Sequence, residues 1–208
     1  MKKRITALGL LWCLSAVMLQ AARVDTVLVR SAAMNKDVKV VYVLPDKAIG
    51  KQACPVVYLL HGYGGNARSW VQLKPELPQM ADEKGIIFVC PDGKNSWYWD
   101  SPENPAYRYE TFVTSELVKY TDGNYATIPD RKARAISGLS MGGHGALWSA
   151  IRHKDVFGAA GSMSGGVDIR PFPQNWEMSK QLGEFAANKA SWEAHTVVNQ
   201  LDKIVNGE

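Results

Sequence analysis

The sequence predicts an α/β fold with a mostly parallel central sheet, and two observations support this. First, the apolar runs at 56–60 and 86–89 have the continuous hydrophobicity of strands that are covered on both faces. Second, segments with helical spacing of apolar residues separate such runs, and alternation of strands with helices is typical of parallel sheets. The 208 residues suffice for one domain with a single sizeable core.

The start of the predicted domain has a different pattern. Residues 24–30 and 38–44 alternate apolar and polar side chains, as half-buried strands do, and the turn-like segment 31–37 lies between them. Pro45 and Asp46 end the second strand. We therefore expect an antiparallel hairpin at the N-terminal side of the sheet.

The other elements follow from the same patterns. The expected helices span 67–84, 109–120, 142–151 and 192–205, and the expected further strands span 133–137 and 157–163. Pro75 and Pro78 interrupt the first of these helices. The last helix is predicted from an apolar stripe that includes Val197, Leu201 and Ile204.

The first 22 residues are typical of a cleaved secretory signal peptide. Lys2, Lys3 and Arg4 precede an apolar run over 5–19, which is short for a membrane span, and small residues follow it. A buried N-terminal helix is the alternative. Trp12 is too bulky to precede a lipidated cysteine, so we expect no stable membrane anchor. The prediction is a secreted or periplasmic protein whose domain spans 23–208.

Charge and cysteine content limit the possible partners. Without the first 22 residues the formal charge falls from +4 to +1, since three basic residues lie there, so nothing indicates nucleic-acid binding. Cys54 precedes one predicted strand and Cys90 ends the next, which places their thiols on the order of 15 Å apart. A disulfide needs Cα atoms within about 7 Å. Two free, largely buried thiols are therefore expected.

The motif that organises the chain is Gly138-Leu139-Ser140-Met141-Gly142. It lies between a predicted strand and a predicted helix, where Gly-x-Ser-x-Gly forms a sharp turn with an exposed nucleophilic serine. Ser140 is therefore the predicted nucleophile. The N–H of Met141 is expected to stabilise an oxyanion, because it follows the nucleophile at the start of a helix.

A second oxyanion donor is expected from the loop after an earlier central strand. His61-Gly62-Tyr63-Gly64-Gly65 lies there, and its glycines allow the backbone to turn inward. We predict the Tyr63 N–H as the donor, with His61 ordering the loop through hydrogen bonds and with both His61 and Gly62 among the substrate-binding residues. An ordinary glycine-rich turn is the alternative. No spacing suits a metal or a phosphate, so no cofactor is predicted.

Several separated motifs together resemble one family. In this order they are Leu60-His61-Gly62-Tyr63-Gly64-Gly65, Pro91-Asp92-Gly93, Ser96-Trp97-Tyr98, Asp100-Ser101-Pro102 and Gly138-Leu139-Ser140-Met141-Gly142-Gly143-His144-Gly145-Ala146. They resemble the putative-esterase family of α/β-hydrolases, which includes esterase D-like, tributyrin, feruloyl and acetylxylan esterases and antigen 85-like mycolyltransferases. The resemblance covers about 24–208.

The resemblance implies a serine carboxylesterase with an α/β-hydrolase fold. Its expected substrates are small acyl esters or carbohydrate-linked esters such as the feruloyl and acetyl esters of plant cell walls. It also implies that residues 161–166 line the acyl site. Transfer of the acyl group to a sugar is an alternative, as is a non-catalytic protein of this fold.

The resemblance also implies an acid and a histidine on loops after two last strands, and we find neither. The sequence therefore predicts a domain that lacks these two strands and is incomplete at its C-terminus. Of the histidines present, His195 is expected to lie in a helix, His144 to be a packing residue and His153 to be exposed. Asp168 is the best-placed candidate for the acid after Ser140, but the residues present form no convincing catalytic triad.

The aromatic cluster Trp97-Tyr98-Trp99 has two readings. It follows a predicted strand at the sheet edge where ligands bind in α/β folds, so its rings could stack on a phenolic acyl group or a sugar. Trp97 and Tyr98 are the residues predicted to contact substrate. Alternatively, the cluster packs against the body of the domain. Trp176 and Trp192 are predicted to be core residues.

Overall fold

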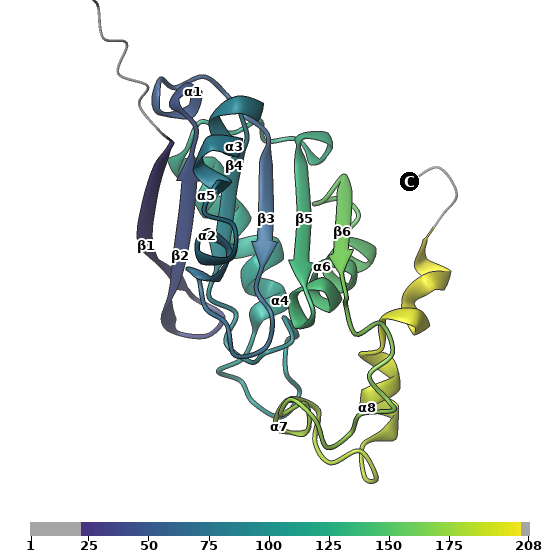
Figure 1. Ribbon diagram of the computed structural model, residues 1–208. Coiled ribbons are helices and arrows are strands. Elements are labelled where there is room, and N and C mark those ends of the chain that lie inside the picture. Colours follow the sequence, from purple (N-terminus) through teal and green to yellow (C-terminus); the bar gives the residue numbers. More distant parts are fainter. Residues whose placement is uncertain (1–21, 205–208) are drawn as a thin grey trace, which may run out of the picture.

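The computed structural model describes residues 22–204, and the predicted signal peptide lies outside them except for Ala22. A six-stranded sheet in the order β1-β2-β4-β3-β5-β6 forms the centre of the molecule (Figure 1). Its strands are β1 Arg23–Ser31, β2 Lys36–Leu44, β3 Val56–Leu60, β4 Ile87–Pro91, β5 Arg134–Leu139 and β6 Ala159–Met163.

The sheet confirms the predicted α/β-hydrolase architecture. β1 and β2 form the expected antiparallel hairpin, and β2 pairs antiparallel with β4. β4, β3, β5 and β6 are parallel to their neighbours. The carboxyl ends of β3 and β5 therefore lie side by side, which brings the loops that follow them together.

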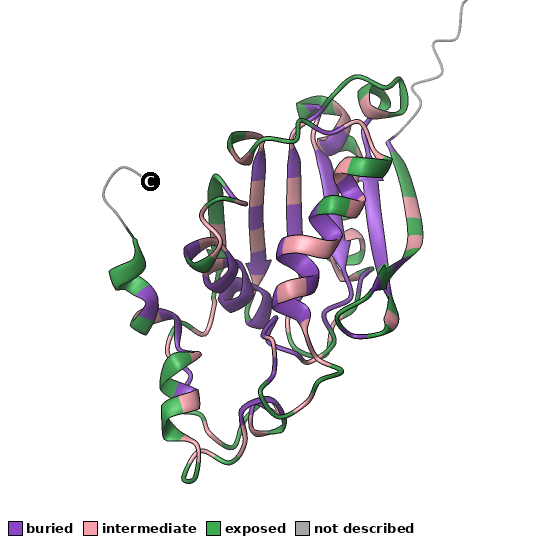
Figure 2. Cartoon of the chain, turned by 180° about the vertical axis from the view of Figure 1, so that it is seen from behind, coloured by how far each residue is buried: buried purple, intermediate pink, exposed green. Residues whose placement is uncertain are grey.

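Two apolar clusters cover the two faces of the sheet. Alternate residues of β2 separate between them: Val41 and Val43 face α2 (Ser69–Leu73) and α3 (Leu77–Lys84), whereas Val40 and Tyr42 face the opposite side. The opposite side is covered by the helical segment from α4 (Tyr109–Thr111) to α5 (Leu117–Asn124) and by α6 (Met141–Arg152) (Figure 1). The central strands are buried on both faces, as their continuous hydrophobicity predicts (Figure 2).

The predicted helices differ from the structure in three places. The helix expected over 67–84 is divided into α2 and α3, and Pro78 lies in the first turn of α3, where its missing N–H is tolerated. The helix expected over 109–120 contains a π-helical segment, η1 (Phe112–Glu116), between α4 (Tyr109–Thr111) and α5 (Leu117–Asn124).

The third difference is a correction. The single helix predicted over 192–205 is instead α8 (Lys189–Ala194) followed by a 3₁₀ segment, η3 (Val197–Lys203). Thr196 is extended between them, and the Val198 N–H donates to the carbonyl of Val167. A tertiary hydrogen bond therefore interrupts a segment whose apolar spacing is helical.

The other short elements are α1 (Asp46–Ile49), η2 (Arg131–Ala133) and α7 (Ser179–Leu182). Cys54 and Cys90 are both free and buried, as predicted. Among residues 22–204, no helix combines the length and the apolar character needed to cross a bilayer.

β6 forms the edge of the described sheet opposite β1, and four of its five residues are exposed. Beside it lies an apolar groove of about 390 Å³ between α6, β6 and η3. Its lining includes Leu147, Ile151, Phe157, Val197, Leu201 and Ile204.

Candidate active site

Ser140 lies at the tip of a strained turn between β5 and α6. Its backbone has φ 54° and ψ −115°, a conformation that non-glycine residues rarely adopt and that costs of order 1–3 kcal/mol. The Ser140 N–H donates to the carbonyl of Met163 at 2.8 Å, and the residue is exposed. The turn therefore holds a solvent-accessible hydroxyl in a fixed position.

Two glycines of the motif are required by close backbone contacts. A Cβ atom on Gly142 would lie 2.2 Å from the Leu60 carbonyl oxygen, and one on Gly138 would lie 2.2 Å from the carbonyl of Gly142. Atoms do not approach so closely, so β5, α6 and the end of β3 pack together only because these side chains are absent. The sequence motif therefore has the tight strand–turn–helix geometry that was predicted.

The loop after β3 lies beside the serine. β3 pairs with β5 so that Leu60 is opposite Gly138, and a Cβ atom on Gly62 would lie 3.6 Å from the Cβ of Ser140. Met141 is the first residue of α6, so its N–H has no partner within the helix. Gly62, Tyr63, Ser140 and Met141 are therefore brought together.

His61 orders this loop through both of its ring nitrogens. Nδ1 donates to the Gly62 carbonyl at 2.7 Å, and Nε2 accepts from the Gly93 N–H at 2.9 Å. The residue is 2% exposed. It therefore supports the loop that carries Tyr63, and the structure places it beneath that loop.

A cavity of about 210 Å³ opens at Ser140. Its lining is mainly aromatic and apolar and includes Tyr63, Trp97, Ile169, Phe172, Trp176 and Met178. We call it the serine cavity. Residues Ser164 and Gly166 also line it, which agrees with the expected position of the 161–166 segment.

One of the two tryptophans predicted to be core residues lines the serine cavity instead. Trp192 is fully buried, as predicted for a core residue, but Trp176 is 43% exposed and forms part of the cavity wall. Trp176 has a positive φ of 51°, and its carbonyl accepts a hydrogen bond from the Trp97 indole at 3.2 Å. Nothing in the local sequence indicates this backbone conformation, so the sequence carries no signal for it.

Tyr98 is not brought into the serine cavity with Trp97. It is fully buried, its hydroxyl donates to the His61 carbonyl at 3.2 Å, and Gly93 and Gly145 leave room for its ring. Trp97 is itself only 3% exposed. The aromatic cluster therefore packs against the body of the domain, with Trp97 alone reaching the cavity wall.

His144 is a packing residue, as expected. Nδ1 donates to the Gly166 carbonyl and Nε2 accepts from the Trp99 indole, both at 2.8 Å. Complete burial, opposed by the Gly166 bond and reinforced by His195, lowers its pKa to about 4. His144 is therefore neutral at pH 7, and both of its nitrogens are already engaged.

The other two histidines lie away from the serine cavity. His195 follows α8 and packs between Trp148 and Trp99, with ring centroids at 5.3 and 5.5 Å. His153 was expected to be exposed, but it bonds to the Glu110 carboxylate at 2.8 Å. Between residues 22 and 204, no histidine hydrogen-bonds to the Ser140 hydroxyl.

Asp168 is the acid nearest to the serine cavity, and it lines the cavity wall. It forms a bidentate ion pair with Arg170, at 2.8 Å for each contact. The hydrogen bond from Arg170 lowers the pKa of this carboxyl. Asp168 is therefore ionised and paired with an arginine instead of a histidine.

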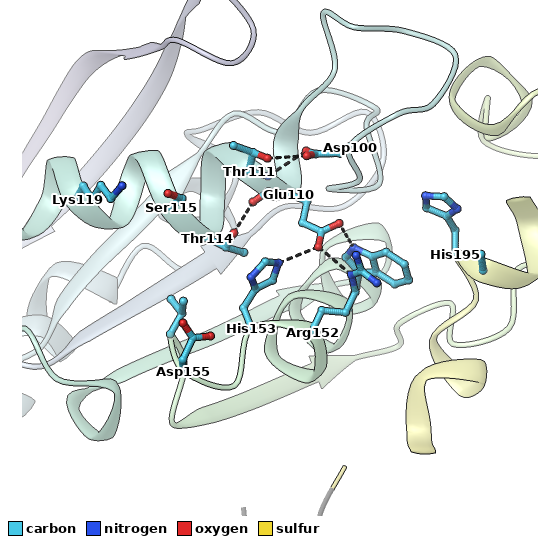
Figure 3. A pocket seen from close by; sticks show the side chains of 13 residues that line it. Asp100, Glu110, Thr111, Thr114, Ser115, Lys119, Arg152, His153, Asp155 and His195 are labelled. Carbon is cyan, nitrogen blue, oxygen red and sulfur yellow. Dashed lines mark hydrogen bonds and ion pairs between the residues drawn. The ribbon is translucent and has the colours of Figure 1, made fainter. Parts of the chain in front are cut away.

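A larger cavity of about 820 Å³ lies elsewhere, between η1, the end of α6 and α8 (Figure 3). Glu110 lies at its base and accepts hydrogen bonds from Trp148, Arg152 and His153, each at 2.8 Å. Burial opposes ionisation of Glu110, but these bonds lower its pKa to about 2. The network connects the two helices that cover this face of the sheet.

Comparison with known proteins supports the same assignment of the fold. An acetyl esterase of Caldicellulosiruptor saccharolyticus is 28% identical over 61% of this chain and 50% of its own length. The diacylglycerol acyltransferase/mycolyltransferase Ag85A of Mycobacterium gordonae is 34% identical over 88% of this chain and 57% of its length. The chain thus spans about half the length of these curated relatives.

A solved structure of a ferulic acid esterase superposes with a TM-score of 0.71 at 28% identity, covering 89% of this chain and 73% of that one. The family model described as "Putative esterase" matches residues 31–206, which is most of the chain. The matched range includes β2 through η3 and therefore the serine turn, the loop after β3 and the cavity between them. The chain belongs to the putative-esterase family of α/β-hydrolases.

Proposed function

We propose that this chain is an exported serine carboxylesterase that cleaves esters through an acyl-enzyme at Ser140. The observation that carries the proposal is the position of Ser140, an exposed hydroxyl in a strained turn next to the loop of Gly62 and Tyr63. A hydroxyl at such a turn is presented to a substrate carbonyl, and backbone N–H groups beside it stabilise the oxyanion that forms.

In the proposed reaction, Ser140 Oγ attacks the ester carbonyl carbon while its proton passes to a general base. The carbonyl oxygen becomes an oxyanion bound by the N–H groups of Tyr63 and Met141. The intermediate then expels the alcohol, which takes up the proton, and water hydrolyses the acyl-enzyme in a second cycle. The resemblance implies a histidine as the base, and residues 22–204 bring none to Ser140.

The lining of the serine cavity suits an acyl group that has a flat, apolar part. Trp97, Phe172 and Trp176 line about 210 Å³ beside the nucleophile. Aromatic walls of this kind gain most from burying a planar ring. A ferulic acid esterase among the structural neighbours is consistent with this choice, so an aromatic acyl ester such as a feruloyl ester is the proposed substrate.

Acyl transfer is the second candidate, supported by the match to Ag85A over 88% of this chain. The two reactions share the acyl-enzyme and differ in what attacks it. Product analysis in the presence and absence of a sugar acceptor separates them. Formation of a new sugar ester would favour transfer, and release of free acid alone would favour hydrolysis.

The test of the proposal is the substitution Ser140→Ala, with Ser115→Ala in η1 as the matched control. Hydrolysis of methyl ferulate and p-nitrophenyl acetate should fall at least about 10³-fold in Ser140→Ala, because no other group would form the acyl-enzyme. Ser115→Ala should retain wild-type rates, and both variants should keep the wild-type circular dichroism spectrum. Turnover retained by Ser140→Ala would exclude Ser140 as the nucleophile.

A further inference from the structure

Asn95 lies on the loop after β4 and connects the two sides of the candidate site. Its Oδ1 accepts a hydrogen bond from the Gly64 N–H at 2.9 Å, and its Nδ2 donates to the Glu177 carboxylate at 3.2 Å. The three residues belong to three loops, which follow β4, β3 and β6 in the chain. One half-buried side chain therefore ties the loop of Tyr63 to the segment that carries Trp176.

The Gly64 N–H belongs to the middle peptide of a tight turn over residues 62–65. The turn is closed by the Gly65 N–H, which donates to the Gly62 carbonyl at 3.0 Å. Gly64 is the third residue and has a φ of 74°, as type II turns require. Type I and type II turns differ in the ψ of the second residue and the φ of the third, which amounts to a flip of the peptide between them. A hydrogen bond to the Gly64 N–H therefore selects one of two orientations of the Tyr63–Gly64 peptide.

Both peptides that meet at Tyr63 are thus held by side chains. On the N-terminal side, the Gly62 carbonyl accepts from His61 Nδ1 at 2.7 Å. On the C-terminal side, Asn95 holds the Gly64 N–H, and packing does not, since Gly64 is exposed and a Cβ atom there would meet nothing within 4 Å. With both peptide planes fixed, the direction of the Tyr63 N–H is fixed as well.

The amide of Asn95 suits its two partners in one orientation only. Its oxygen faces a backbone donor and its nitrogen faces a carboxylate, so a flipped amide would set donor against donor and acceptor against acceptor. An aspartate at position 95 would keep the acceptor for the Gly64 N–H but would place a second carboxylate against Glu177. The site therefore requires one acceptor and one donor on a short side chain.

Glu177 is itself held in place on the far side of this connection. Trp176 and Glu177 have consecutive positive φ values of 51° and 54°, a strained arrangement that is typical of functional sites. Lys180 also donates to the Glu177 carboxylate, and the hydrogen bonds from Lys180 and Asn95 lower the pKa of that carboxyl. Glu177 is therefore ionised at neutral pH, and its charge strengthens the hydrogen bond that it accepts from Asn95.

We propose that Asn95 is a positioning residue for ester cleavage. It fixes the Tyr63–Gly64 peptide and thereby directs the Tyr63 N–H toward the oxyanion. Glu177 in turn orients the Asn95 amide. The inference rests on the proposed function, because it concerns the oxyanion donor of that reaction. Oxyanion donors act more on the transition state than on the bound ester, so a misdirected N–H should lower kcat and leave KM nearly unchanged.

The test is a set of substitutions at positions 95 and 177 of the 208-residue chain, assayed with p-nitrophenyl acetate. Asn95→Ala removes both hydrogen bonds, so kcat should fall about 10-fold while KM stays within about 2-fold of the wild type. Asn95→Asp should lower kcat as far, because its carboxylate repels Glu177. Glu177→Gln should keep kcat within about 3-fold, since its amide oxygen still accepts from Asn95.

The double variant with Asn95→Asp and Glu177→Gln gives the sharpest measurement. The new glutamine amide can donate to the new aspartate, which still accepts from the Gly64 N–H, so the connection is rebuilt with its second hydrogen bond reversed. kcat should return to within about 3-fold of the wild type. Melting temperatures measured in parallel separate a loss of kcat from a loss of folded protein. A double variant as slow as Asn95→Asp, or an unchanged kcat in Asn95→Ala, would overturn the inference.

Asn104→Ala is the matched control for Asn95→Ala. The Asn104 side chain also accepts from a backbone N–H, that of Ala106 at 3.0 Å, and it does not line the serine cavity. This variant should keep the wild-type kcat and KM. A fall in kcat equal to that of Asn95→Ala would show that losing any such hydrogen bond slows the reaction, and the positioning role would be wrong.

An NMR arm needs no turnover and separates this inference from the proposed function. Hydrogen exchange of the Gly64 amide should become faster in Asn95→Ala and return toward the wild-type rate in the double variant. If exchange follows this order but the wild type cleaves no ester, the proposed function is overturned and the orientation of the loop by Asn95 is supported. If the wild type cleaves esters and Asn95→Ala changes neither kcat nor exchange, the proposed function stands and the positioning role is wrong.

Discussion

The two sides of the candidate site are held in place by different means. On one side, the serine turn and the loop after β3 are positioned by backbone contacts that leave no room even for a Cβ atom at Gly138 or Gly142. On the other side, the irregular segment 164–178 forms the wall of the serine cavity with side chains such as Phe172 and Trp176. Backbone geometry therefore positions the groups proposed to carry out ester cleavage. The proposed substrate specificity depends instead on side chains, which can be exchanged without disturbing those backbone contacts.

The largest effect on stability is expected from a substitution in the serine turn, on the first side of the site. Gly142→Ala puts a methyl group 2.2 Å from the Leu60 carbonyl oxygen, so β3 and α6 must separate or the chain must fail to fold. We expect a loss of more than about 3 kcal/mol in the free energy of unfolding, measured by urea denaturation.

Gly123→Ala is the matched control, because a Cβ atom there meets nothing within 4 Å and the residue lies in α5. It should stabilise the protein by about 0.5–1 kcal/mol. Equal stabilities for the two variants would show that the close approach at Gly142 is not a constraint.

An intermediate effect concerns the link between the two sides. His144 lies in the first turns of α6 and donates to Gly166 in the opposite wall. Its pKa is lowered from 6.5 to about 4, so between these pH values the unfolded chain binds a proton that the native chain does not. Stability should therefore fall as the pH decreases from 6.5 to 4, by on the order of 3 kcal/mol.

The measurement is the free energy of unfolding of the wild type and of His144→Gln across this pH range. Glutamine keeps one donor and one acceptor but does not titrate, so the difference between the two proteins should change with pH. A constant difference would mean that His144 does not link protonation to folding.

The smallest effect is expected on the second side. Trp176 is 43% exposed, so Trp176→Ala should change the free energy of unfolding by less than about 1 kcal/mol. It removes an aromatic wall of the serine cavity, and kcat/KM for methyl ferulate should fall about 10-fold relative to p-nitrophenyl acetate. A uniform decrease for both esters would indicate a general role in folding or in positioning Ser140.

The same contrast explains what the sequence predicts. Strands such as β3 and β4 are continuous apolar runs because they are buried on both faces, and the serine turn is recognisable because its glycines are sterically required. Burial on both faces and close backbone packing are requirements that can be recognised from the local residue types alone. The hairpin, the parallel order and the free cysteines follow from them.

The walls of the cavities depend on tertiary contacts, which leave little trace in the local sequence. The apolar spacing over 192–205 predicts one helix, but the hydrogen bond from Val198 to Val167 divides it. Trp176 has the composition of a core residue, and only a positive φ turns it to the cavity. Gln181 lies in the short helix α7 and is of a residue type that is mostly exposed, yet it is only 4% exposed.

The stacking of Trp97 on Trp99 has an optical consequence. Their indole rings lie 5.5 Å apart and only 17° from parallel. At this separation the electronic transitions of the two indoles interact, so the pair should give a strong near-ultraviolet circular dichroism signal. Because Trp97 lines the serine cavity, a small molecule that displaces its ring would alter that signal. Ligand binding at the serine cavity is therefore expected to change the near-ultraviolet circular dichroism spectrum, a measurement that needs no label.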